Sequence, residues 1–187
     1  MNQLLFPLKA VFIAIPLEES AKRQFQALQE ALKDFGEILS FQNPLSPHLT
    51  VQYWPTLMEI EFRQILRQAE TLATKAMPFT LKILGVDTFG SRGQDTVLFL
   101  KVPFSDPLAR LRKLCPWPQG TSFSPHITLA RIRHPQRFAV VRKNILKALK
   151  GTAFETPVDR LRLYAEVDGR KQTPLMDFLL SASEPPL

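Results

Sequence analysis

Hydrophobic and polar positions follow the period of a strand in some segments of the chain and the period of a helix in others. Residues 9–17 form a short apolar run rich in β-branched side chains and broken by Pro16, which predicts a buried strand. Residues 18–35 place apolar side chains at helical spacing and end at Gly36, which predicts a helix. The same criteria predict helices at 58–76, 106–114 and 135–149, and strands at 48–54, 79–89, 96–102, 123–132, 158–167 and 175–180.

The order of these elements is strand, helix, strand, helix, strand, followed by a second round of similar parts. No linker rich in glycine, serine or charge separates the two rounds. We therefore expect one bilobal α+β domain over residues 1–187, with pseudo-symmetric halves near 1–90 and 91–187.

A six-residue pattern occurs twice, once in each half. Ser-Pro-His-Leu-Thr-Val at residues 46–51 returns as Ser-Pro-His-Ile-Thr-Leu at residues 124–129. In a strand, residues i and i+2 share a face, so each copy presents one imidazole and one hydroxyl together. If the copies pair about a pseudo-two-fold axis, His48, Thr50, His126 and Thr128 converge on one cleft. Two groups that titrate near neutrality and two hydroxyl donors suit phosphate-ester chemistry.

Charge and cysteine content add modest constraints. The net charge of +7 favours polyanionic partners, although the basic residues are spread along the chain. Cys115, the single cysteine, lies in an apolar setting that favours a core or turn role over a nucleophile, and one cysteine excludes an internal disulfide. We expect a cytoplasmic protein without a signal peptide or membrane contact, because no apolar stretch approaches the ~18 residues of a transmembrane helix.

Residues 123–131, Phe-Ser-Pro-His-Ile-Thr-Leu-Ala-Arg, resemble the two-histidine (2H) phosphoesterase superfamily. More narrowly, the chain resembles the RNA 2′,3′-cyclic phosphodiesterases, also called the 2′-5′ RNA ligase family. The opening strand at 11–16 and the closing Leu-Arg-Leu-Tyr at 161–164 are similar too. The first motif departs from the family, because Val-Gln-Tyr-Trp-Pro replaces the usual Phe-Leu-Gly segment and leaves the natural substrate open.

The resemblance implies a duplicated fold with two antiparallel sheets flanking a central cleft and helices outside. It also implies hydrolysis of a 2′,3′-cyclic phosphate at an RNA end to a 2′-phosphate, with His126 as base and His48 as acid. Thr50, Thr128 and Arg131 would then bind the phosphate oxygens. We expect no metal and no cofactor, RNA ends or cyclic nucleotides as partners, and a monomer.

Other polar and aromatic residues near the motifs have weaker assignments. Tyr53 and Trp54 are candidates for stacking on a base, but strand alternation sends them to opposite faces, so one of them belongs to the core. His134 is expected in a surface loop. Ser46 and Ser124 are expected to cap the turns before the strands, since no nucleophile elbow accompanies them.

Four other functions remain open at this point. The same site could run in reverse as a 2′-5′ RNA ligase, or act on a small cyclic nucleotide. A non-enzymatic RNA- or nucleotide-binding module would not require two intact His-x-Thr motifs. A two-histidine metal site lacks carboxylate or cysteine ligands at metal spacing.

Overall fold

The computed structural model describes residues 4–118 and 123–182, and its helices fall where the apolar periodicity predicts them. The first helix is shorter than expected, because α1 ends at Glu30 and the chain continues through a separate 3₁₀ turn at Lys33–Phe35. The helices are α1 (Glu19–Glu30), α2 (Glu59–Lys75), α3 (Asp106–Leu114) and α4 (Pro135–Ala148).

Most strands belong to one antiparallel sheet with the order β10-β9-β1-β3-β7-β6-β5, and β2 pairs with β7 beside this path. A separate two-stranded sheet joins β4 to β8. The strands are β1 (Leu8–Pro16), β2 (Leu39–Phe41), β3 (His48–Leu57), β4 (Phe79–Leu84), β5 (Val86–Ser91), β6 (Gln94–Lys101), β7 (His126–Ile132), β8 (Ala153–Val158), β9 (Arg160–Val167) and β10 (Arg170–Leu179).

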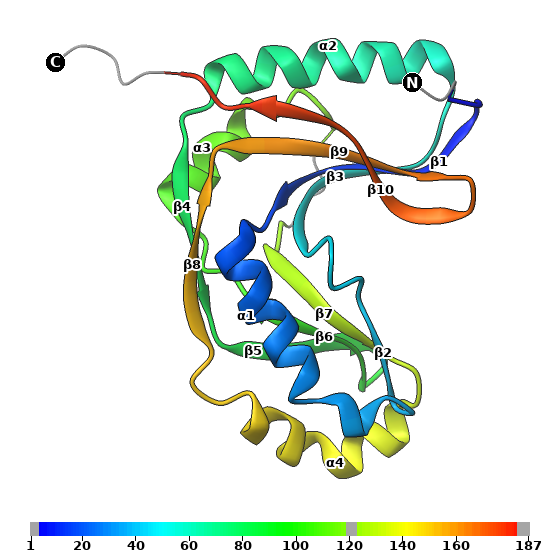
Figure 1. Cartoon of the computed structure of the whole chain (residues 1–187), viewed down its shortest axis with the longest axis vertical. Coiled ribbons are helices and arrows are strands. Elements are labelled where there is room, and N and C mark those ends of the chain that lie inside the picture. The colour runs from blue at the N-terminus through cyan, green and yellow to red at the C-terminus, as the bar shows by residue number, and fades with distance from the viewer. Residues whose placement is uncertain (1–3, 119–122, 183–187) are drawn as a thin grey trace, which may run out of the picture.

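The sheet arrangement corrects the expectation of two sheets flanking a cleft. Strands β10, β9, β1 and β3 form one part, and β7, β6, β5 and β2 form the other, but hydrogen bonds join them into one sheet. The junction is narrow, since β3 and β7 pair at a single position, Leu49 opposite Ile127. Figure 1 shows the two parts curving away from this junction, with α2 outside one part and α4 outside the other.

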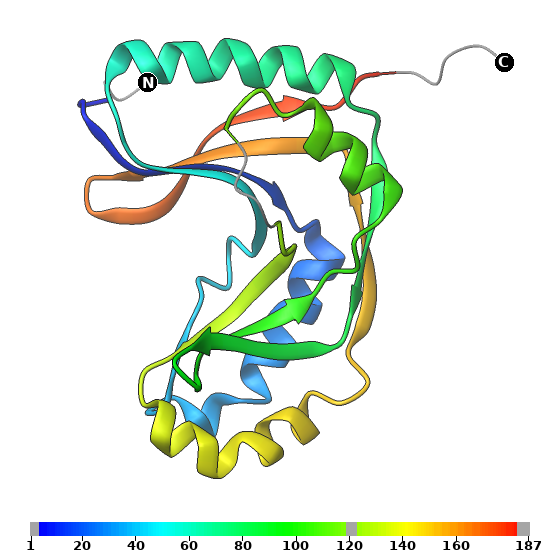
Figure 2. The same ribbon diagram turned by 180° about the vertical axis from the view of Figure 1, so that it is seen from behind.

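Gly85 divides a segment that the sequence predicts as one strand over 79–89. Its φ of +90° lies in the left-handed region, which a β-carbon disfavours, and the chain turns there between β4 and β5. As a result β4 pairs with β8 while β5 pairs with β6 in the large sheet. The view from behind in Figure 2 shows β4 and β8 running together along the side that connects the two parts.

The main apolar core lies under one face of the large sheet. On the strands that carry the repeated motifs, Leu49, Ile127 and Leu129 are fully buried in this core. The neighbouring residues His48, Thr50, His126 and Thr128 point to the other face, which we call the histidine face. Alternation along two adjacent strands therefore separates the packing residues from the candidate chemistry.

Gln29 is one of the few buried polar side chains among the described residues. Its amide nitrogen, Nε2, donates to the carbonyl oxygens of Gln42 at 2.9 Å and of Leu129 at 3.2 Å. These bonds fasten α1 to the second motif strand. Removing the Gln29 amide takes one donor from each of these buried carbonyl oxygens, although that of Leu129 also accepts from the backbone N–H of Gln42.

We predict that Gln29→Leu lowers the free energy of unfolding by about 1–3 kcal/mol, the usual cost of leaving buried polar groups unsatisfied. Gln24→Leu is the matched control, because Gln24 lies exposed on the same helix and its loss should change stability by less than about 0.5 kcal/mol. Urea denaturation of both variants measures the difference. Equal effects would show that the buried hydrogen bonds do not fasten α1.

Candidate active site

The two motif strands meet side by side at the middle of the sheet. Continuing the antiparallel register by one residue on either side of the Leu49–Ile127 pair places His48 opposite Thr128 and Thr50 opposite His126. Each imidazole therefore lies across from the hydroxyl of the other motif. The structure brings the four predicted residues to one patch of the histidine face.

Both histidines are held by the same local hydrogen bond. Nδ1 of His48 lies 2.7 Å from the carbonyl oxygen of Ser46, and Nδ1 of His126 lies 2.8 Å from that of Ser124. A carbonyl oxygen only accepts, so Nδ1 of each ring carries the proton and each neutral imidazole presents its Nε2 lone pair outward. The proline between serine and histidine fixes the backbone of this short turn. The repeated Ser-Pro-His thus sets both the orientation and the tautomer of the rings.

The two rings differ in their surroundings. His48 is buried against the rings of Phe12 and Tyr164, with centroid distances of 4.8 and 5.3 Å. His126 is only half-buried and contacts Phe89 and Phe99 edge-on, at 5.1 and 5.6 Å. The sequence analysis did not identify these four aromatic residues. Phe12 and Tyr164 do lie in the two segments that resemble the family, whereas Phe89 and Phe99 were marked only by their place on predicted strands.

Burial lowers the pKa of His48 below its ordinary value of 6.5, because the charged imidazolium would lose its hydration. The hydrogen bond to the Ser46 carbonyl opposes this change, and the nearby His126 adds a smaller lowering. His48 is therefore neutral near pH 7 in the free protein.

A β-bulge follows each motif and reverses the alternation beyond it. Opposite β1, the register shifts between Thr50 and Gln52, so Tyr53 pairs with Phe12 on the histidine face. Opposite β6, the register shifts between Thr128 and Ala130, so Arg131 pairs with Val97. The two bulges occupy equivalent places in the two motifs, which makes Tyr53 and Arg131 positional counterparts.

The bulge decides which of the two aromatic candidates can face a ligand. Tyr53 is 52% exposed, whereas Trp54 is half-buried, packs against the core and contacts Trp117 edge-on at 5.4 Å. Simple alternation from His48 would have given the opposite result. Of the two candidates, Trp54 is the one that packs with the core, and Tyr53 stays a candidate for stacking on a base.

Side chains from two helices donate hydrogen bonds to the carbonyl oxygens of the bulged residues. The carbonyl oxygen of Val51 accepts from Nη1 of Arg112 on α3 at 3.1 Å, and that of Leu129 accepts from Gln29 on α1. A bulged residue leaves the ladder and needs such partners when it is buried. The helices thus support the geometry that turns Tyr53 and Arg131 to the histidine face.

Cross-strand neighbours add charged residues to this face that the sequence analysis missed. Across β1 from Thr50, Ala14 pairs with Arg162, which binds Asp177 across β9 and β10. Arg162 lowers the pKa of Asp177, chiefly through their hydrogen bond. Beside His126 on β6 lies Lys101, whose Nζ is 3.8 Å from Asp87. Sequence periodicity alone does not reveal which strands become neighbours.

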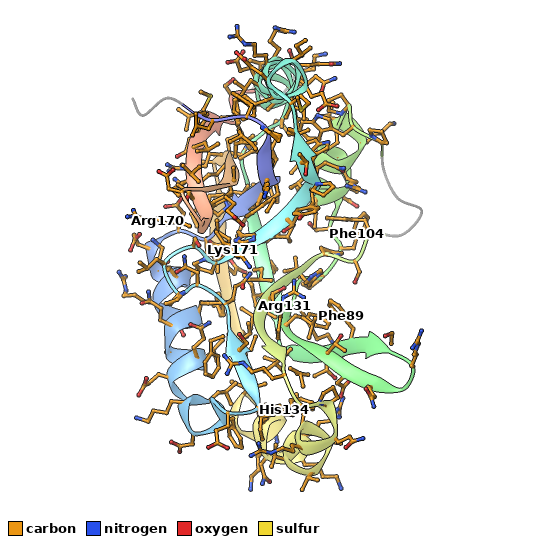
Figure 3. The ribbon with its side chains drawn as sticks, turned by 90° about the vertical axis from the view of Figure 1, so that its right-hand side faces the viewer. Phe89, Phe104, Arg131, His134, Arg170 and Lys171 are labelled. Atoms are coloured by element: carbon orange, nitrogen blue, oxygen red, sulfur yellow. The ribbon has the colours of Figure 1, made fainter. Side chains whose placement is uncertain are left out.

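Figure 3 shows how the labelled residues lie when this side of the molecule faces the viewer. Arg170 and Lys171 lie on one side of the view, Phe89 and Phe104 on the other, and Arg131 between them. His134 is exposed at the start of α4, as expected for a surface residue.

Two cavities of about 350 and 750 Å³ lie away from the histidine face, along α2 and α3.

The environment of Cys115 argues against a role as nucleophile. Burial raises the pKa of the Cys115 thiol to about 11, so it is not a thiolate nucleophile near neutral pH. No group of three or more His, Cys, Asp or Glu side chains is placed to hold a metal ion in residues 4–118 and 123–182. Within the same residues no helix is long and apolar enough to span a bilayer.

Comparison with known proteins identifies the class. A family model for the 2′-5′ RNA ligase superfamily, to which the two-histidine phosphoesterases belong, matches residues 57–170, more than half of the chain. The chain belongs to the 2′-5′ RNA ligase superfamily. The matched segment includes the second motif and begins after the first, where the sequence departs from the family pattern.

Individual relatives agree with this assignment. The chain is 28% identical over 132 residues to an RNA 2′,3′-cyclic phosphodiesterase of Bacillus subtilis (strain 168), covering 64% of this chain and 69% of the relative. A crystal structure of a Thermus thermophilus protein shares the fold with a TM-score of 0.73 and 23% identity, covering 94% of this chain and 100% of that one. Apo LigT of E. coli shares it with a TM-score of 0.68 and 19% identity, over 94% and 99%.

The lowered pKa of His48 predicts a pH dependence of stability. The unfolded chain binds a proton at this histidine more readily than the folded chain, so the free energy of unfolding falls as the pH drops below about 6.5. Urea denaturation of wild type should therefore lose more stability between about pH 7 and pH 5 than His48→Asn does. His134→Asn, at an exposed site, is the control and should keep the wild-type slope. If stability falls with pH in His48→Asn as steeply as in wild type, the pKa of His48 is not the cause of the pH dependence.

Proposed function

We propose that the protein hydrolyses 2′,3′-cyclic phosphate ends of RNA to 2′-phosphates by acid–base catalysis with His48 and His126. The observation that carries the proposal is the matched presentation of the two rings. Both rings lie on one face, both are fixed through Nδ1, which leaves Nε2 for a substrate, and each lies across from the threonine of the other motif. This arrangement supports proton transfer on two sides of one phosphate.

The reaction requires two proton transfers. One imidazole removes a proton from water as the water oxygen bonds to phosphorus. The bond from phosphorus to the ribose 3′ oxygen breaks, and the second imidazole donates a proton to that oxygen. The product carries a 2′-phosphate and a free 3′-hydroxyl.

Charge that builds on the non-bridging oxygens would be met by hydroxyl and guanidinium donors. Thr50 is exposed and Thr128 half-buried on the histidine face, and each lies directly across from the histidine of the other motif. Arg131 is exposed and forms no ion pair with any described residue, so its guanidinium is available to a phosphate.

The assignment of base and acid rests on two conflicting arguments. Family resemblance favours His126 as base and His48 as acid. The lowered pKa of His48 favours the neutral ring, which is the form that a base requires. A bound phosphate anion beside His48 would raise its pKa again, so we keep the family order.

The comparisons support a nucleotide substrate. The curated Bacillus relative is an RNA 2′,3′-cyclic phosphodiesterase, and LigT has been crystallised with phosphate and with 3′-AMP. In this chain the exposed cations Arg131, Arg170 and Lys171 lie on the side of the molecule shown in Figure 3. Cations around the histidine face favour an RNA end over a mononucleotide, because phosphates beyond the cyclic one gain further contacts.

We expect His48→Asn and His126→Asn each to lower kcat/KM by about 10²–10⁴-fold on an oligonucleotide with a 2′,3′-cyclic phosphate. EDTA in the assay should leave wild-type activity unchanged, because imidazoles perform both proton transfers. His134→Asn should retain full activity, since His134 is exposed at the start of α4. Near-wild-type turnover in either motif variant would exclude the mechanism.

A substrate whose leaving group needs no proton identifies the acid. A nucleoside 3′-phosphate esterified with p-nitrophenol loses its aryl oxide without protonation. If His48 is the acid, His48→Asn should recover most of the wild-type rate on this ester, whereas His126→Asn should stay slow. The reverse result would exchange the two roles, and no recovery in either variant would show that neither ring acts solely as an acid.

The adjacent aromatic residues give a matched test of the bulge. Tyr53→Ala should weaken binding of the RNA end by about 1–3 kcal/mol, the usual value for stacking on one base, with little change in stability. Trp54→Ala should instead lower the free energy of unfolding by about 2–5 kcal/mol. Inhibition by a non-hydrolysable RNA end and urea denaturation measure the two effects. If Trp54→Ala weakens binding and leaves stability unchanged, the assignment of faces is wrong.

A further inference from the structure

The hairpin between β9 and β10 contacts the turn that precedes the first histidine. The Ser46 hydroxyl donates to the side-chain carbonyl oxygen, Oε1, of Gln172 at 3.2 Å. These residues lie 126 positions apart in the chain, and both are half-buried. Ser46 is the residue whose carbonyl oxygen accepts from Nδ1 of His48. A continuous path of two hydrogen bonds therefore joins the hairpin to the imidazole.

The backbone of Gln172 has an unfavourable conformation. Its φ is +60°, in the left-handed region, and the register of β10 against β9 shifts at this point. Glycine is the residue that this kind of bulge prefers, because a β-carbon there costs about 1–2 kcal/mol. A long side chain at such a position suggests that the side chain itself is needed. The hydrogen bond to Ser46 is a reason for glutamine at this position.

Other hydrogen bonds also hold the turn before His48, since the Leu45 N–H donates to Oδ1 of Asn43 and Nε2 of Gln26 donates to the Pro44 carbonyl oxygen. The turn before His48 is held by the backbone bonds from Ser46 to Asn43 and from Leu17 to Pro47, and both leave the Ser46 hydroxyl free to bond to Gln172. The expectation that Ser46 caps its own turn is therefore replaced by a contact across the fold. Residues 170–172 also bring Arg170 and Lys171, both exposed, to the same strand end.

We propose that Gln172 is a positioning residue that orients His48 through Ser46. The inference rests on the proposed function, since it concerns one of the two rings to which that function assigns a proton transfer. By holding Ser46, the side chain keeps the Ser46 carbonyl oxygen in line with Nδ1 and so keeps Nε2 of His48 directed out of the sheet. A misdirected ring lowers turnover without weakening substrate binding.

Gln172→Gly separates this role from a structural one. Glycine accepts the left-handed backbone, so the midpoint of thermal unfolding should be no lower than that of wild type. On a 2′,3′-cyclic mononucleotide, kcat should fall by about 2- to 10-fold, the range for one neutral hydrogen bond, with KM unchanged. At pH 8 the ¹⁵N chemical shifts of the His48 ring should move toward the Nε2–H tautomer, while those of His126 stay as in wild type.

Arg92→Gly is the matched control. Arg92 also has a positive φ, +53°, and lies exposed in the turn between β5 and β6. The substitution Arg92→Gly should relieve the same kind of backbone strain without changing kcat or the chemical shifts of the His48 ring. In a double-mutant cycle, Ser46→Ala should add little to Gln172→Gly, because both variants remove the same hydrogen bond.

Unchanged kcat and unchanged His48 ring shifts in Gln172→Gly would overturn the proposal, as would equal effects in Arg92→Gly or additive effects in the cycle. The ring shifts also separate this inference from the proposed function. If wild type hydrolyses no cyclic phosphate, the proposed function fails, yet the His48 tautomer still shows whether Gln172 positions the ring.

Discussion

One antiparallel contact organises the protein. Leu49 and Ile127 are fully buried and form the single position at which β3 and β7 pair. Because their side chains fill the core, the residues on either side of them must face outward together. The contact therefore fixes the core, joins the two parts of the sheet and places both His-x-Thr motifs on one face. Local backbone geometry then makes the two rings equivalent in tautomer.

The site depends on departures from regular strand geometry as much as on the strands. Each motif is followed by a bulge, and each bulged carbonyl oxygen is met by a helix side chain, Arg112 for Val51 and Gln29 for Leu129. The Leu129 carbonyl oxygen also accepts from the backbone N–H of Gln42 at 3.1 Å, so in the second motif the helix adds a second hydrogen bond. The helices thus stabilise the reversal of faces that brings Tyr53 and Arg131 beside the histidines.

The repeated motifs are equivalent in backbone but not in environment. His48 lies under Phe12 and Tyr164, where desolvation lowers its pKa, whereas His126 remains partly open between Phe89 and Phe99. Two identical groups with different burial can serve as acid and base at one pH. The hairpin contact from Gln172 reaches the turn before the first ring.

The sequence by itself determined the four helices, most strands and the alternation that puts His48 with Thr50, and His126 with Thr128, on one face of each strand. Apolar periodicity and a repeated six-residue pattern are local signals, and they predict backbone conformation because that conformation depends on neighbouring residues. Only the tertiary structure decided that Gly85 splits a strand, that one sheet replaces two, and that Tyr53 rather than Trp54 shares the histidine face. The sequence likewise did not reveal the aromatic rings packed against the two histidines, the Arg162–Asp177 pair or the Gln172 contact. Each depends on which strands become neighbours and at what register, and the energy that selects those pairings comes from packing between residues far apart in the chain.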